Sequence, residues 1–321
     1  MMRERISVFH ELLAERRFDD RFEIDPSNAV DVLIPLIHTN DLWRSNLLSV
    51  YREIPVRRLL IGDAGCIDDS IEIAREFPRV VVFDHRDFNS LGYSIRKLIE
   101  AVETEWFIYL HSDVYLPEGW FEGMKRHQSE YDWFECGQHM TILAEYPADL
   151  ADVKRPYSGS QMGRKDAFRD VLPMIDDDFL YRNEDIILEA LVRKAGFRYG
   201  RVDGTFHYHQ ITHKASPWSR KVKRVVIDVE TSPDEEVRSC MMQAKGIIKY
   251  LEPSEQWLVE GVVVNVRRLL ALGKLEPVAF RRWVAATNPA WLPHIRKALL
   301  RRRLRAFLRS TRNTLAARWS R

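Results

Sequence analysis

Short apolar runs alternate with amphipathic stretches through the first third of the chain. The apolar runs have the length and composition of buried strands and occupy residues 29–35, 56–61, 79–83 and 106–110. Between them, residues 41–52, 70–77 and 91–102 repeat apolar positions at helical spacing. The connections are short, so this pattern predicts an α/β fold with a doubly wound, mainly parallel sheet flanked by helices.

The rest of the chain is richer in helical patterns. Helices are expected at residues 3–17, 117–127, 184–196, 232–250, 255–272 and 280–286, and strands at 133–141 and 204–213. Pro289 and Pro293 are expected to separate the last helices from a basic tail. We therefore predict three regions: a helical extension at 1–28, an α/β domain at 29–215 and a helical region at 216–321.

The composition is ordinary for a soluble globular protein, with 45% apolar and 30% charged residues in 321. No window has the roughly 18 apolar residues of a membrane span, and residues 1–20 are charged throughout, unlike a secretory signal. The three cysteines are far apart and form no CxxC metal motif. A cytoplasmic location with reduced thiols is the expectation.

An acidic residue follows the most apolar of the predicted strands. The run 106–110 ends in His111, Ser112 and Asp113, and Pro117 and Gly119 then turn the chain. Ligands of open α/β sheets bind at the carboxyl ends of the strands, so Asp113 is a candidate binding residue. The alternative is that Asp113 only caps the helix that follows.

A second acidic loop, GDAGCIDDS, follows the strand predicted at 56–61. Asp68 or Asp69 is expected to cap the next helix, whereas Asp63 precedes the turn and can accept hydrogen bonds from a base or ribose. The loop contains no GxGxxG, and no GxxxxGK[ST] motif is present, which argues against a Rossmann dinucleotide site and a P-loop.

Two further candidates lie downstream. Glu184 and Asp185 open a helix that runs to Gly196, where acids are also common simply because they favour the helix dipole. His207 and His209 would share one face of a strand, which suits metal or phosphate binding, although such histidines are often structural. A zinc hydrolase is the competing metal site, but no HExxH motif accompanies the pair.

In order and spacing, these motifs resemble the inverting GT-A-fold glycosyltransferases of the family 2 type. The resemblance covers about residues 29–210. It rests on the triplet His111, Ser112 and Asp113, on the Glu184–Asp185 pair, and on three further groups: Ile34 and Pro35; Asp63, Gly65 and Asp68; and Gly92, Ser94, Arg96 and Lys97. It departs from the family where DxD is usual, because His111 replaces the first carboxylate. The α/β domain would then be a GT-A catalytic domain.

The resemblance implies a role for each motif. Nucleotide-sugar binding is expected of Pro35, Ile37, Asp63, Arg96, Lys97, His111, Ser112 and Asp113. Asp185 would be the general base with Glu184 beside it, and Asp113, His209 and His207 would bind Mn²⁺ or Mg²⁺. The donor would be a UDP- or GDP-sugar and the acceptor a glycan or lipid-linked hydroxyl. Arg96 and Lys97 have the alternative of being solvated helix residues.

The physical case for a cation is independent of the resemblance. A nucleoside diphosphate leaves readily only when its developing charge is neutralised, and Mg²⁺ or Mn²⁺ does this with one or two protein carboxylates. Inversion also needs a base on the opposite face of the sugar to accept the proton of the attacking hydroxyl. The alternative function is a GT-A-like protein that binds a nucleotide or a membrane surface without catalysis, which the missing first acid favours.

The C-terminal tail is strongly cationic. Residues 296–321 contain ten lysines and arginines and no acid, and Leu300, Leu304 and Phe307 recur at helical spacing among them. We expect residues 294–321 to bind an anionic membrane, which would make the protein peripheral on the inner face of the membrane. The alternative is a helix docked on its own domain. No nucleic-acid-binding motif accompanies the charge, so no nucleic-acid partner is expected.

Overall fold

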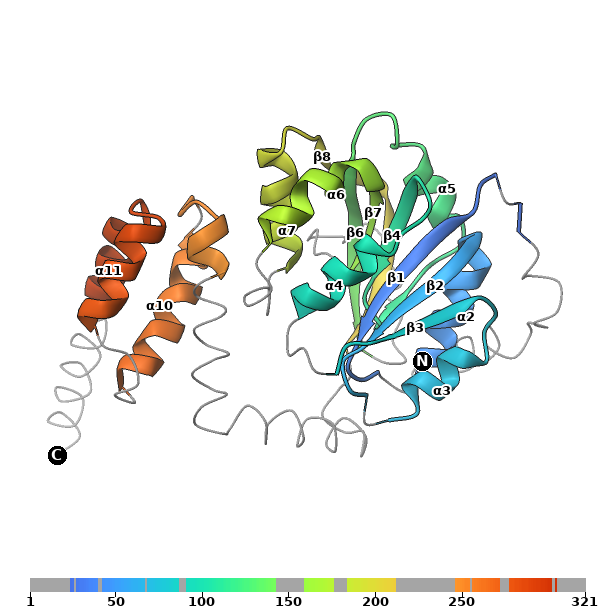
Figure 1. Ribbon diagram of the computed structural model, residues 1–321, viewed down its shortest axis with the longest axis horizontal. Helices are drawn as coiled ribbons and strands as arrows, with labels where there is room; N and C mark the ends of the chain where they lie inside the picture. The colour runs from blue at the N-terminus through green and yellow to red at the C-terminus, as the bar shows by residue number, and fades with distance from the viewer. Residues whose placement is uncertain are drawn as a thin grey trace, which may run out of the picture. The chain divides into compact units, whose positions relative to one another are not determined.

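The computed structural model describes residues 24–25, 27–39, 42–66, 68–86, 91–142, 159–175, 184–211, 246–254, 256–271, 277–301 and 304. These residues belong to two compact units (Figure 1). The first contains the described residues up to 211, and the second contains those from 246 onward. The predicted helix at 3–17 lies outside the described residues, as does most of the one at 232–250.

The first unit is built on one eight-stranded sheet. Its strands are β1 (Val30–Leu36), β2 (Val56–Asp63), β3 (Val80–Asp84), β4 (Trp106–Leu110), β5 (Val114–Tyr115), β6 (Trp133–Ile142), β7 (Ser160–Arg164) and β8 (Tyr199–Ile211). They lie in the order β3-β2-β1-β4-β7-β6-β8-β5. β3, β2, β1 and β4 are parallel, β7 runs antiparallel to both β4 and β6, and β8 pairs parallel with β6 and antiparallel with β5.

Helices cover both faces of this sheet. They are α2 (Trp43–Glu53), α3 (Ser70–Arg75), α4 (Leu91–Glu100), α5 (Trp120–Lys125), α6 (Lys165–Val171), the 3₁₀ helix η2 (Leu172–Met174) and α7 (Glu184–Lys194). Val32 and Ile34 of β1 join a core cluster with Trp43 of α2 and Trp120 of α5. Leu33 points to the other face, because side chains alternate along a strand, and α4 packs against β1 and β2 there.

The predicted α/β fold, with a sheet flanked by helices, is confirmed. The strands expected from apolar runs appear as β1 to β4 and β6, with ends shifted by only a few residues. The sheet is nevertheless more mixed than expected, since β7 returns antiparallel between β4 and β6. β5 and β7 were not predicted, because β5 has two residues and the sequence of β7, SQMGR, has no apolar run.

The second unit is helical. It contains α10 (Gln256–Ala271), α11 (Pro277–Thr287) and a further helix at 291–301. The first two confirm the helices predicted at 255–272 and 280–286. Pro289 lies in the turn that separates α11 from the last helix, as predicted. Pro293 does not separate helices, because it lies in the first turn of the last helix, where an N–H has no intrahelical partner. None of the described helices is long and apolar enough to cross a membrane.

Candidate functional site

The site lies where β4 ends and two short strand pairings bring distant residues together. β5 runs antiparallel to β8 with Val114 opposite His209. This register places the His209 Nε2 atom 3.1 Å from Oδ2 of Asp113. His111 completes the group, its ring 5.9 Å from that of His209 and nearly perpendicular to it. One ligand atom from each of His111, Asp113 and His209 lies within 4.8 Å of the others.

The donor set of this triad suits a divalent cation. Two imidazoles and a carboxylate are acceptable ligands for Mn²⁺-type ions, and three protein ligands leave coordination positions for phosphate oxygens. His209 Nδ1 lies 3.1 Å from the side-chain oxygen of Gln138, which can only accept a hydrogen bond. With a cation bound, the Nδ1 atom of His209 can donate a hydrogen bond to Gln138, which leaves the Nε2 atom beside Asp113 free to ligate. Such an outer hydrogen bond is the usual means of orienting a metal-binding histidine.

Charge in the triad also favours a cation. Burial opposes ionisation of Asp113, but the hydrogen bond from His209 and the two neighbouring imidazoles lower its pKa below the ordinary value. The carboxylate is therefore ionised at neutral pH, as a metal ligand must be.

His207 lies beside this triad and outside it. Its ring is 6.0 Å from the ring of His209, and its Nδ1 atom is 2.7 Å from the hydroxyl of Ser160. The side chain is fully buried, and burial together with the neighbouring imidazoles holds its pKa well below the ordinary range. His207 is thus a neutral residue that packs behind His209, and direct ligation by it stays a prediction.

The acid pair at the start of α7 adjoins the triad. Oε1 of the buried Glu184 lies 3.4 Å from Nε2 of His111 and accepts a hydrogen bond, also 3.4 Å long, from the Tyr109 hydroxyl. Burial and the negative charge of Glu184 raise the pKa of Asp185 to about 7. A carboxylate with a pKa near the working pH is well suited to accept a proton.

His111 connects the two groups. Burial opposes its protonation, but Glu184 and Asp113 raise its pKa overall. In the resemblance noted from the sequence, this residue occupies the position where a carboxylate is usual. In the structure it contributes an imidazole to the triad and lies against the acid pair, so the triplet keeps a polar link to α7.

The loops after β1 and β2 meet β4 at the same edge of the sheet. Asp63 Oδ1 accepts hydrogen bonds from the backbone N–H groups of Gly65 and Cys66, at 2.9 and 2.8 Å. One oxygen of Asp63 therefore shapes its own loop, in which Gly65 has a φ of 95° that favours glycine. Binding of a base or ribose by Asp63 stays a prediction.

The sequence predicted that Asp68 or Asp69 caps α3; Asp69 is the N-cap residue but its side chain makes no capping hydrogen bond, and Asp68 bonds the first N–H of the helix instead. Its Oδ1 accepts a hydrogen bond from the N–H of Ser70, and its Oδ2 accepts one from the N–H of Thr39 in the loop after β1. In the same region Ser112 accepts a hydrogen bond from Asn46 at its backbone oxygen and donates one from its hydroxyl to the backbone oxygen of His38. These bonds hold the ends of three neighbouring strands together.

The other candidate donor-binding residues have local roles in the structure. Arg96 and Lys97 of α4 pair with Glu100 at 2.9 and 2.7 Å; the Lys97 side chain is partly exposed, whereas only 15% of the Arg96 side chain is exposed. Pro35 lies within β1, and Ile37 follows that strand with 49% of its surface exposed. Contact of these four residues with a nucleotide sugar stays a prediction.

Three residues of the site were missed in the sequence. Gln138 and Tyr109 lie within strands, where nothing local distinguishes them from core positions. Gly159 accepts a hydrogen bond from the N–H of His111, and a Cβ atom there would lie 2.9 Å from His207 Nε2 and 3.1 Å from His209 Nδ1. The residues just before it, 143–158, lie outside the described ones.

Comparison with known proteins gives structural neighbours only. No family model matches this chain, and no curated protein matches its sequence. S. aureus TarS in complex with UDP-GlcNAc is 11% identical with a TM-score of 0.47, over 85% of this chain and 91% of TarS. A mannosyltransferase from Pyrobaculum calidifontis in complex with GDP-Man and Mn²⁺ is 10% identical with a TM-score of 0.47, over 93% and 92%.

A third neighbour is the bifunctional IspDF from Campylobacter jejuni, with 9% identity and a TM-score of 0.38. The matched region is 55% of this chain, and it spans only 50% of the IspDF chain. With identities of 9–11% and TM-scores below 0.5, these similarities establish neither an activity nor a donor for this protein.

Proposed function

We propose that this protein is a metal-dependent, inverting glycosyltransferase of the GT-A type that moves a sugar from a UDP- or GDP-sugar to a hydroxyl of a glycan or lipid-linked acceptor. The observation that carries the proposal is the meeting of two groups at the end of β4. One is a metal-capable triad of His111, Asp113 and His209, and the other is an acid pair in which Asp185 has a pKa of about 7.

The triad would hold the cation. A divalent cation bound there supplies positive charge that neutralises the developing charge of the leaving nucleoside diphosphate. Asp113 provides the anionic ligand, and Gln138 keeps the Nε2 atom of His209 directed at the site. His111, which lies against Glu184 of α7, would be the third ligand.

Asp185 would act on the acceptor. Its carboxylate takes the proton of the acceptor hydroxyl as that oxygen forms a bond to the anomeric carbon, while the bond from this carbon to the diphosphate oxygen breaks. Attack from the face opposite the leaving group inverts the anomeric configuration. Glu184 supports this role, because its negative charge raises the pKa of Asp185 and its own oxygen is positioned by Tyr109 and His111.

The proposed donor and cation belong to the same classes as the ligands of two structural neighbours. TarS was solved with UDP-GlcNAc, and the mannosyltransferase with GDP-Man and Mn²⁺. The proposal for this chain rests on its own site, and an anionic membrane surface remains the proposed partner of residues 294–321.

Slow donor hydrolysis tests the function without knowledge of the acceptor. The protein is incubated with a panel of UDP-, GDP- and CMP-sugars and Mn²⁺, and release of free sugar is measured. We expect release from at least one UDP- or GDP-sugar, loss of this activity in Asp113→Ala, and its retention in Asp203→Ala, which removes an exposed aspartate of β8.

The alternative, a protein that binds a nucleotide without catalysis, gives a different result. Donors would then raise the melting temperature while no sugar is released. Sugar release that survives Asp113→Ala, or that needs no divalent cation, would refute the proposed mechanism.

A further inference from the structure

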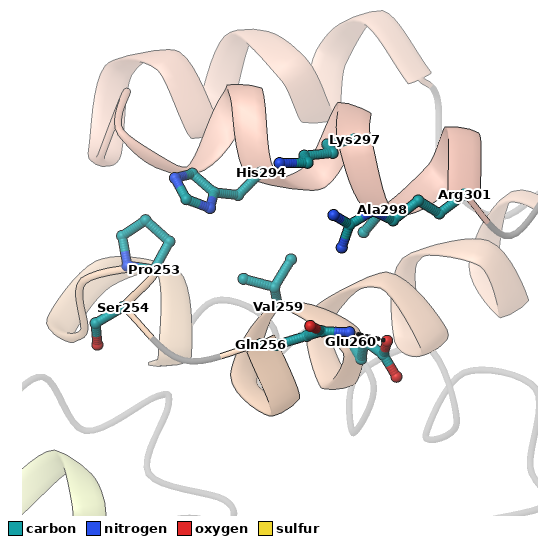
Figure 2. Close-up of a pocket in the computed structure, with 9 residues that line it drawn as sticks. All are labelled: Pro253, Ser254, Gln256, Val259, Glu260, His294, Lys297, Ala298 and Arg301. Atoms are coloured by element: carbon teal, nitrogen blue, oxygen red, sulfur yellow. Dashed lines mark hydrogen bonds between the residues drawn. The ribbon is translucent and has the colours of Figure 1, made fainter.

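The helical unit contains a small hollow of about 260 Å³ between α10 and the helix at 291–301 (Figure 2). The last helix contributes His294, Lys297 and Arg301 to one wall. Gln256, Val259 and Glu260 of α10 face them from the other wall. Every residue that lines the hollow belongs to the second unit, so it is separate from the site at the end of β4.

Charge in this groove is unbalanced toward the positive. Within the described residues, no carboxylate lies at ion-pair distance from Lys297 or Arg301, although Glu260 lines the same hollow. One oxygen of Glu260 accepts a hydrogen bond from the side-chain amide of Gln256 at 3.0 Å. Among the described residues that line the hollow, two permanent cations therefore accompany one carboxylate, and an anionic group is the ligand that this arrangement attracts.

The size and donor types indicate a phosphate-sized group. The hollow is smaller than the roughly 300–1,000 Å³ of typical small-molecule sites, so it suits a head group better than a whole nucleotide. A guanidinium offers a planar pair of N–H donors that matches phosphate oxygens, and an ammonium adds a point charge. Arg301 and Lys297 supply one of each, four residues apart on the same helix.

An apolar ridge runs beside the groove. Leu300 and Leu304 are 69% and 58% exposed, although most leucines of a folded protein are buried. At helical spacing they lie on the side opposite Trp291 and Ile295, which are buried within the unit. Arg301, next to Leu300 in the chain, flanks this ridge, so the cations of the groove and the exposed apolar side chains adjoin on one short helix.

We propose that this groove binds the phosphate head group of an anionic phospholipid, with Leu300 and Leu304 inserted at the bilayer surface. Free phosphate can pair with the cations but leaves the apolar ridge in water. An anionic bilayer offers phosphate groups to the cations and an apolar interior to Leu300 and Leu304. This goes further than general attraction by a basic tail, because it assigns the contact to a defined hollow within the described residues. It does not depend on the proposed transferase activity.

Vesicle flotation of the full chain tests the proposal. Vesicles of phosphatidylcholine alone are compared with vesicles that also contain phosphatidylglycerol. Lys297→Glu/Arg301→Glu should reduce binding to the anionic vesicles by about 30-fold or more, since each near-surface cation contributes roughly 1 kcal/mol and about 1.4 kcal/mol is tenfold. Leu300→Ser/Leu304→Ser should also weaken binding, at unchanged charge.

The matched control is Arg281→Glu/Arg282→Glu, which reverses two exposed charges of α11 in the same unit. It should bind like the original protein, and circular dichroism and melting temperature should show all three variants folded. An equal loss of vesicle binding in the control and in Lys297→Glu/Arg301→Glu would overturn the proposal. Binding of the original protein to neutral vesicles as strong as to anionic ones would also overturn it. Saturation of the groove by inorganic phosphate, with no binding to vesicles, would also overturn it.

Discussion

Replacing Asp185 by asparagine should greatly reduce activity and at the same time stabilise the protein at alkaline pH. The structure raises the pKa of this carboxyl from 3.8 to about 7, mainly because burial and the charge of Glu184 oppose ionisation. A carboxyl whose pKa is higher in the folded than in the unfolded state contributes to the free energy of unfolding below pH 4. This contribution is lost as the pH rises through 7. Asparagine has no charge to bury, so the free energy of unfolding of Asp185→Asn should not show this loss as the pH rises.

The magnitude follows from the size of the pKa change. One pKa unit corresponds to about 1.36 kcal/mol, so the rise predicts at most about 4 kcal/mol. The carboxylate retains some contact with solvent and is coupled to Glu184, which leads us to expect about 2–4 kcal/mol. Relative to the original protein, Asp185→Asn should gain this free energy of unfolding between pH 4 and pH 7, and the gain should then level off.

The assay is urea unfolding at a series of pH values in the presence of a chelator, because a bound cation would itself alter the pKa of Asp185. Asp170→Asn, which removes an exposed aspartate of α6, controls for the loss of one surface charge. A stability difference between Asp185→Asn and the original protein that does not grow from pH 4 to pH 7 would refute the reasoning. Sugar transfer by the variant should fall about 10²–10⁴-fold, as expected for loss of a general base.

Three further outcomes test other parts of the structure. Gly159→Ala should weaken Mn²⁺ binding at least tenfold by calorimetry, because its Cβ would lie 2.9 Å from His207 Nε2 and 3.1 Å from His209 Nδ1; unchanged affinity would contradict this packing. Gln138→Leu should weaken Mn²⁺ binding about 10–100-fold by removing the acceptor for His209, and an affinity equal to the original would exclude this orienting role. Trp291→Ala should cost about 3–5 kcal/mol in the helical unit, measured by urea unfolding, since its side chain is fully buried; a loss below 1 kcal/mol would contradict that burial.

Much of the first unit could be predicted because its signals are local. The strand 106–110 was read with its observed bounds, since five consecutive apolar residues before a polar triplet indicate a buried strand. The acids just before α3 indicated that one of Asp68 and Asp69 bonds the start of this helix, and Asp68 does so through the N–H of Ser70. β7 was missed because its pairing with β4 and β6, not its composition, makes it a strand.

The sequence by itself determined the α/β order, the strand end that carries Asp113 and the acids that open α7, because periodicity and chain order are written in neighbouring residues. Only the tertiary structure decided which side chains share a site. The pairing of β5 with β8 selects His209 over His207 for the triad, and the approach of α7 to β4 joins His111 to Glu184. These contacts connect residues from 73 to 96 positions apart, and local patterns carry no information about such pairings.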